Sequence, residues 1–295
     1  MLMHRQPLTS RARTCFRVFR DPFGEISCAE DLYTSPDIGY IREAMYQAAR
    51  HDDFLAVIGE SGSGKSTLRR DLDNRLAANG APVITIQPYV LAMEDNDRKG
   101  KTLKSDHIAE SVLAAIAPSE RPRLSQEARF RQLHDRLKES HQAGTRHVLI
   151  IEEAHSLPIP TLKHLKRLRE LETGFSKLLS IILIGQPELA IKLSPKNTEV
   201  REVAQRISIV TLPPIPSSKL PDFLAHRLGR AGSALADVAD ESAVDAMVSR
   251  LTLGSGERQI SLLYPLAIGN LFTAAMNLAA SLGETRITAD IIRGI

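Results

Sequence analysis

Short apolar runs alternate with amphipathic stretches along the first two thirds of the chain. Each run is rich in valine, isoleucine and leucine, and the intervening stretches have helical periodicity. Continuous apolar runs of this kind are typical of parallel strands that helices cover on both faces. The pattern therefore predicts an α/β domain with a parallel sheet. The predicted strands are Phe54–Ile58, Val83–Ile86, Val148–Ile151, Leu178–Ile184 and Ile207–Leu212.

The segments before and after this α/β pattern have different patterns. A proline-rich break, Thr211–Pro221, follows the last predicted strand, and only helical patterns come after it. Before the first strand, Asp37–Arg50 predicts an amphipathic helix, preceded by a basic segment. We therefore expect three parts: a basic N-terminal arm with a leading helix (residues 1–50), an α/β domain (51–212) and a small helical domain (213–295).

One uncharged stretch, Ser261–Leu282, is long enough to cross a bilayer. Pro265, Gly269, Asn270 and Asn277 interrupt it, which favours a helix buried in protein. No signal peptide is apparent, and the two cysteines form no metal-binding spacing. We therefore expect a cytoplasmic protein without a membrane partner. The net charge of +3 leaves nucleic-acid contacts to local clusters of basic residues.

A glycine-rich loop follows the first predicted strand and leads into a helix. Its sequence, GESGSGKST, has the spacing Gly-x-x-x-x-Gly-Lys-Ser, which is the phosphate-binding loop pattern in its required strand–loop–helix context. Backbone N–H groups of such a loop point at phosphate oxygens, and the following helix adds its positive end. We expect ATP with Mg²⁺ here, Lys65 reaching the β- and γ-phosphates and Ser66 binding the metal. The predicted nucleotide-binding residues are Gly59, Glu60, Ser61, Gly62, Ser63, Gly64, Lys65, Ser66 and Thr67.

Acidic residues follow the strand Val148–Ile151. Glu152 is predicted on the metal side, on the expectation that its strand lies next to the phosphate-loop strand, and Glu153 is predicted to polarise the attacking water. Gln186 ends the next strand, where it contacts that water or the γ-phosphate, or serves a capping role. His155 is interpreted as structural, because no second ligand is near it in the sequence.

Together these segments resemble the AAA+ ATPases from about Asp21 onward. The stretches IILIGQPEL, QRISIVTLPPI and GERQISLL are similar to the family of ExeA-type secretion ATPases and phage Mu B-type transposition ATPases. The resemblance implies a five-stranded core with a helical lid, and ATP-driven assembly into rings or helical filaments. It also implies that Arg206 or Arg201 acts on a neighbouring subunit's nucleotide, and that Arg258 reaches the γ-phosphate. The sequence departs from the pattern of this family at two places. Glu152 stands where aspartate is usual, and Gly-Glu-Arg in the lid stands where Gly-x-Pro-Arg is usual.

Two basic segments are candidates for DNA contacts. The first, after the second predicted strand, comprises Arg98, Lys99, Lys101, Thr102 and Lys104, and in initiator- and transposition-type AAA+ proteins this position faces a central channel. Lysines contact phosphates without reading bases, so binding would be largely independent of sequence and multiplied by assembly. The second is the N-terminal arm with Arg11, Arg13 and Arg17. A solvated loop and a disordered arm are the alternatives.

The expected function is ATP-dependent delivery of double-stranded DNA to a transposase by a homo-oligomer. ExeA-type proteins continue past the ATPase into a membrane span and a periplasmic domain, whereas this chain ends after the lid, which we take to weigh against secretion. Two alternatives stay open. One is a helicase loader or replication initiator, and the other is an ATPase with a protein client.

Overall fold

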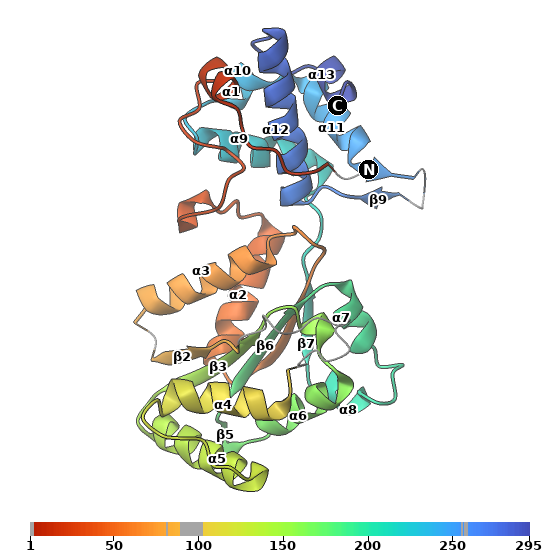
Figure 1. The fold of residues 1–295 in the computed structure, drawn as a ribbon. Helices are drawn as coiled ribbons and strands as arrows, with labels where there is room; N and C mark the ends of the chain where they lie inside the picture. The colour runs from red at the N-terminus through yellow and green to blue at the C-terminus, as the bar shows by residue number, and fades with distance from the viewer. Residues whose placement is uncertain (1–2, 81, 89–102, 255, 257–258) are drawn as a thin grey trace. The chain divides into compact units, whose positions relative to one another are not determined.

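The computed structural model describes residues 3–80, 82–88, 103–254, 256 and 259–295 (Figure 1). The chain divides into two compact units. We call them the α/β unit, Pro36–Glu60 and Leu68–Leu212, and the helical unit, Met1–Ser35, Ser61–Thr67 and Pro213–Ile295. Each is described by itself below.

A five-stranded parallel sheet in the order β2-β3-β6-β1-β7 forms the centre of the α/β unit. Every strand predicted from the apolar runs is present, within about two residues, and β1, β3 and β6 are buried almost along their full length. The sheet corrects one expectation. β6 lies between β1 and β3, so the acidic strand is not adjacent to the phosphate-loop strand. The strands are β1 (Phe54–Ile58), β2 (Val83–Ile86), β3 (Arg146–Ile151), β6 (Ser180–Gly185) and β7 (Ser208–Thr211).

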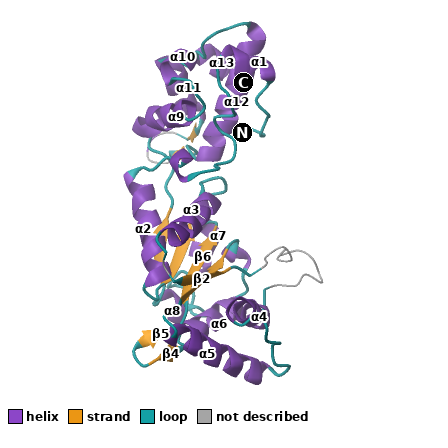
Figure 2. Cartoon of the chain, turned by 90° about the vertical axis from the view of Figure 1, so that its left-hand side faces the viewer, coloured by secondary structure: helices purple, strands orange, loops and turns teal. Residues whose placement is uncertain are grey.

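Helices cover both faces of this sheet, as the apolar runs require. In Figure 2 the sheet lies between α2 and α3 on one side and α4, α5 and α6 on the other. Apolar side chains of the second group share one core with the inward faces of β1, β3 and β6. The smaller elements are η2 (Ala154–Ser156) and a hairpin of β4 (Glu172–Thr173) and β5 (Ser176–Lys177). The helices are α2 (Pro36–Arg50), α3 (Lys65–Ala78), α4 (Ser105–Ile116), α5 (Gln126–Gln142), α6 (Ile159–Arg169), α7 (Pro187–Lys192) and α8 (Arg201–Ala204).

The helical unit is built around α12 (Pro265–Leu282), whose buried side chains run along most of its length. Among the described residues, α12 is the one helix that is both long enough and apolar enough to cross a membrane. However, 61% of this helix is buried inside the protein. This burial is what the interrupted apolar stretch predicted. The other elements are η3 (Ser217–Lys219), α9 (Leu220–Gly229), α10 (Leu235–Val238), α11 (Glu241–Arg250), α13 (Ala289–Arg293) and a hairpin of β8 (Thr252–Leu253) and β9 (Ile260–Ser261).

The N-terminal segment belongs to the helical unit. The helix α1 (Ser10–Cys15) contacts α12, and Ala12 and Phe16 are buried in the same core as α12. Asn277 of α12 accepts a hydrogen bond from the Thr9 N–H at 2.9 Å and donates one to the Pro7 carbonyl at 3.0 Å. The expected part formed by residues 1–50 is therefore divided, because residues 3–35 pack with the helical unit and α2 packs on the sheet. The disordered arm, which was the alternative for this segment, is therefore not what the structure shows.

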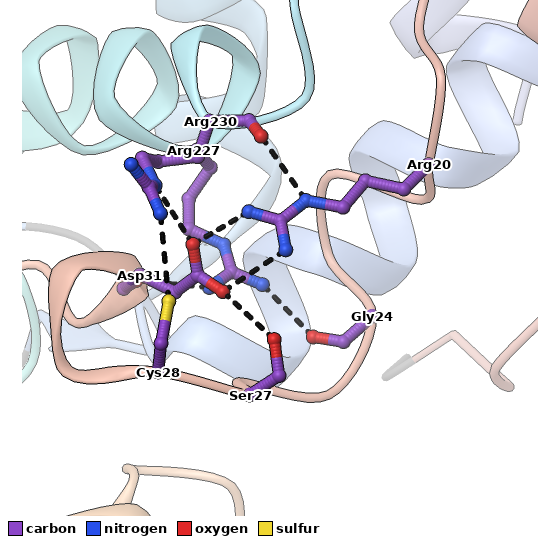
Figure 3. Close-up of polar contacts among 7 residues, drawn as sticks. All are labelled: Arg20, Gly24, Ser27, Cys28, Asp31, Arg227 and Arg230. Carbon is purple, nitrogen blue, oxygen red and sulfur yellow. Dashed lines mark hydrogen bonds and ion pairs between the residues drawn. The ribbon is translucent and has the colours of Figure 1, made fainter.

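Asp31 attaches this segment to α9 through a buried cluster of charges (Figure 3). Its carboxylate is 3% exposed and accepts hydrogen bonds from Arg20 at 2.5 and 3.1 Å and from Arg230 at 2.8 Å. Arg227 donates to the backbone oxygens of Asp31 at 3.2 Å and of Gly24 at 2.9 Å. The Arg20 guanidinium, assisted by Arg230, holds the pKa of the Asp31 carboxyl far below its usual value. The carboxylate therefore stays ionised and paired over the whole neutral and mildly acidic range.

Replacing Asp31 by asparagine is expected to destabilise the helical unit by about 3 kcal/mol, because Arg20 and Arg230 lose the buried carboxylate with which they pair. Thermal unfolding at pH 7 measures this as a lower Tm, with the exposed neighbour Glu30→Gln as the matched control. The unfolded chain binds a proton near the usual aspartate pKa of 3.8, and the folded chain does not. The advantage of aspartate should therefore decline as the pH falls below 3.8. Equal Tm values for the two variants would show that the cluster contributes nothing to stability.

Candidate nucleotide-binding site

The glycine-rich loop connects the carboxyl end of β1 to the first residue of α3, Lys65. Its first residue, Gly59, donates its N–H to the carbonyl of Gly185 at 3.1 Å, which ties the start of the loop to the end of β6. Two of its glycines have positive φ, +75° at Gly62 and +102° at Gly64. Only glycine adopts these angles at little cost, so the curl of the backbone favours glycine at both of these positions.

Gly62 has a second reason to lack a side chain. A Cβ atom there would lie 2.4 Å from Cβ of Leu266, in the first turn of α12, and the Leu266 N–H donates to the Gly62 carbonyl at 3.2 Å. The stretch Ser61–Thr67 accordingly groups with the helical unit. This part of the loop therefore packs directly against α12.

Two polar groups of the loop fit an anionic ligand. The Ser63 hydroxyl is buried and has no hydrogen-bond partner among the described residues, which is a costly arrangement that a phosphate oxygen would relieve. Lys65 is only 9% exposed and supplies a buried positive charge beside that hydroxyl in the sequence. Ser66 is exposed, so its hydroxyl is available to a metal ion, while Thr67 is partly buried and Glu60 and Ser61 are exposed. The residues present therefore fit a magnesium nucleotide.

Glu152 follows the last residue of β3 and lies beside a cation. Its Oε1 is 3.4 Å from Nε of Arg69 on α3, and Arg69 also pairs with Asp73 at 2.8 Å. Neither Glu152 Oε1 nor Arg69 Nε has a hydrogen-bond partner among the described residues. Arg69 is a functional candidate that the loop motif does not mark.

Glu153 has a backbone conformation that non-glycine residues rarely adopt. Its φ and ψ are +50° and +33°, in the left-handed region, which costs roughly 1–2 kcal/mol for such a residue. Strain of this kind is concentrated at functional sites, where the surrounding structure imposes it. The strained turn brings the Glu153 carboxylate to the carboxyl edge of the sheet, where it is half exposed.

His155 lies between Glu153 and Gln186. Its Nε2 is 3.6 Å from Oε2 of Glu153 and 3.5 Å from the side-chain nitrogen of Gln186, whose backbone N–H donates to Nδ1 at 3.4 Å. The sequence interpretation of His155 as structural rested on the absence of a second ligand nearby, and the structure places Glu153 and Gln186 beside its ring. The spacing Glu-x-His after a strand is the signal that could have pointed to this residue.

Residues 48–193 match the family profile described as an AAA domain. This part of the chain, just under half of it, is therefore similar to the AAA domain family. General secretion pathway protein A of Aeromonas hydrophila is 31% identical over 184 residues, which are 61% of this chain and 30% of that protein. The match therefore spans less than a third of the length of that relative.

Solved structures extend the likeness to most of the chain. The ORC2 protein of Aeropyrum pernix, 17% identical, covers 93% of this chain and 71% of its own with a TM-score of 0.60. Cdc6p of Pyrobaculum aerophilum, also 17% identical, covers 92% and 68% with a TM-score of 0.55. The fold is that of the P-loop AAA+ ATPases, as the sequence predicted.

One of two arginines near β7 was predicted to act on a neighbouring subunit's nucleotide. Arg206 lies just before β7, is 56% exposed and pairs with Glu170, while Arg201 is the exposed first residue of α8. Both therefore remain candidates, and Arg206 would have to leave Glu170 in order to act in trans. Arg258, the lid candidate, lies outside the described residues.

The predicted DNA contacts are divided between described and undescribed residues. Arg98, Lys99, Lys101 and Thr102 lie outside the described part of the chain. Lys104 is exposed just before α4, next to a buried Leu103 whose carbonyl accepts a hydrogen bond from Thr161 at 2.9 Å. The second candidate group, on and just after α1, is exposed and consists of Arg11, Arg13 and Arg17.

Proposed function

We propose that this protein binds and hydrolyses ATP with Mg²⁺. The observation that carries the proposal is the cluster of Glu153, His155 and Gln186 at the carboxyl edge of the sheet, where the neighbouring strand β1 leads into the phosphate loop. In this proposal Lys65 and the loop N–H groups hold the phosphates, and Ser66 and Glu152 lie on the metal side. Glu153 polarises the attacking water and Gln186 orients it.

The proposed macromolecular ligand is double-stranded DNA, bound largely without regard to sequence and delivered to a transposase. Three arginines on one exposed segment of the helical unit, together with Lys104 on the α/β unit, support a phosphate-binding role. One subunit offers few contacts. An ATP-assembled ring or filament would repeat them along the duplex, so that DNA affinity depends on ATP. The trans arginine, Arg206 or Arg201, would make hydrolysis depend on the same assembly.

A protein client is the second candidate. The 31% identity to General secretion pathway protein A favours it, since that relative's name refers to secretion. The likeness to ORC2 and Cdc6p concerns the fold, so it favours neither the DNA ligand nor the protein client.

Electrophoretic mobility of a random-sequence duplex, with ATP, ADP or no nucleotide, separates the candidates. We expect a shift mainly with ATP, weakening steeply with salt. Replacing Arg11, Arg13 and Arg17 by glutamine should weaken binding and lower the salt slope by about 0.9 for each phosphate that the variant no longer neutralises. The matched control is Arg121→Gln with Arg123→Gln, two exposed arginines between α4 and α5. If the protein hydrolyses ATP but does not shift the duplex at low salt in any nucleotide state, DNA is not the ligand and the protein-client function is favoured.

A further inference from the structure

The backbone of His155 is held in place from two neighbouring elements. Lys192 of α7 donates from Nζ to the carbonyl of His155, and to that of Leu157 at 3.3 Å. At the end of β6, a Cβ atom on Gly185 would lie 3.2 Å from the backbone nitrogen of His155 and 2.9 Å from a methyl carbon of Leu189. The absence of a side chain at Gly185 therefore allows η2 to approach the end of β6, which brings the His155 ring next to Gln186.

The hydrogen bond at Nδ1 determines what the other side of the ring can do. Because Nδ1 accepts the Gln186 backbone N–H, a neutral imidazole carries its proton on Nε2. Nε2 is 3.6 Å from Oε2 of Glu153 and 3.5 Å from the side-chain amide of Gln186, which accepts from Nε2–H when its oxygen faces the ring. The imidazole ring thus accepts a hydrogen bond from Gln186, which follows β6, and points a donor toward Glu153, which follows β3. These two strands are neighbours in the sheet.

Glu153 needs such a partner. Its side chain is 53% exposed and leaves a strained backbone turn, so solvent alone would let the carboxylate sample several rotamers. A general base must be held close to the proton that it removes, and small displacements of reacting groups are costly. The ring is held by Gln186 and the backbone of His155 by Lys192, so the ring restricts the carboxylate to one region.

We propose that His155 is a positioning residue that holds the Glu153 carboxylate at a fixed position relative to the side chain of Gln186. This inference rests on the proposed ATPase function and deepens it, because it makes the base and the water-orienting amide one linked unit. Displacing Gln186 would then displace Glu153 through the ring. His155 itself has no part in holding phosphate or metal in this proposal.

The test is a double-mutant cycle read by single-turnover ATP hydrolysis and by nucleotide affinity. His155→Ala should lower the hydrolysis rate about 10- to 100-fold, the range expected for a misplaced catalytic group, and leave the nucleotide Kd within about twofold. In a Glu153→Gln background, His155→Ala should cause little further loss, because the group it positions is already absent. Losses that multiply instead would overturn the proposal.

Two conservative variants sharpen the test. In His155→Gln the amide nitrogen reaches about as far as Nε2, whereas in His155→Asn the amide replaces only the atoms near Nδ1. Gln should therefore rescue hydrolysis better than Asn, and the reverse order would contradict a role through Glu153. His164→Ala, at a partly exposed histidine on α6, is the matched control and should leave the rate unchanged.

The outcomes also separate this inference from the function on which it rests. A wild-type protein that binds ATP and never hydrolyses it would overturn both. Normal hydrolysis by His155→Ala would overturn the positioning role alone. A His155→Ala variant that loses nucleotide affinity and thermal stability together would show that the residue is only structural, which also overturns the proposal.

Discussion

Replacing Glu153 by glutamine is expected to lower the rate of phosphate release by about 10²–10⁴-fold, the range that general-base catalysis supplies. The amide keeps the size of the side chain but cannot accept a proton from water. The left-handed backbone of Glu153 is imposed by the turn between β3 and η2, so glutamine should fold into it as glutamate does. Phosphate release under saturating ATP measures the effect.

Nucleotide binding should survive this change, because the proposed role of Glu153 is toward the attacking water, while the glycine-rich loop and Lys65 hold the phosphates. If assembly depends on bound ATP, the Glu153→Gln variant should also stay assembled longer than the wild type. Glu199→Gln, an exposed carboxylate between α7 and α8, is the matched control and should hydrolyse ATP normally. Undiminished phosphate release by Glu153→Gln would remove Glu153 from the role of the base, and with it the positioning role of His155.

The second large effect is expected from Lys65→Ala. Lys65 is a buried cation at the start of α3, where the loop and the helix end favour phosphate. Truncating one partner of a buried charge pair costs about 2 kcal/mol or more, so the Kd for ATP should rise at least about 30-fold. Binding of a fluorescent ATP analogue measures this directly.

Thermal unfolding provides an independent measure of the same effect. At an ATP concentration of about 100 times its Kd, a bound protein gains about 2.7 kcal/mol of stability, and Lys65→Ala should lose most of that gain. Lys163→Ala, at an exposed lysine of α6, should keep it. An ATP-dependent Tm shift in Lys65→Ala equal to that of the wild type would show that nucleotide binds somewhere other than this loop.

The parts of the site that could be predicted are those encoded by neighbouring residues. A strand, a glycine-rich turn and a helix follow one another within residues 54–78, and the positive φ angles of Gly62 and Gly64 are needed wherever such a loop curls. The acidic pair is likewise adjacent to its strand. The residue roles assigned from these patterns stay predictions until they are tested by substitution.

Contacts between distant segments could not be predicted in this way. Arg69 and Glu152 are far apart in the chain, and so are His155 and Gln186, yet each pair is in contact. His155 was interpreted as structural because no second ligand is near it in the sequence. Gln186, which follows another strand, comes close only in the folded sheet. The insertion of β6 between β1 and β3 is equally invisible, since apolar runs report that a strand is buried but not which strand lies next to it.

The sequence by itself determined the five strands, the glycine-rich loop and the buried character of α12, because each depends on local periodicity or on backbone angles that few residues adopt. The tertiary structure alone decided that residues 3–35 pack with the helical unit and that Arg20 pairs with Asp31. It also decided that Glu153, His155 and Gln186 meet at one edge of the sheet. The physical reason is that these contacts depend on strand order and on long-range packing of side chains, and neither leaves a periodic pattern in the chain.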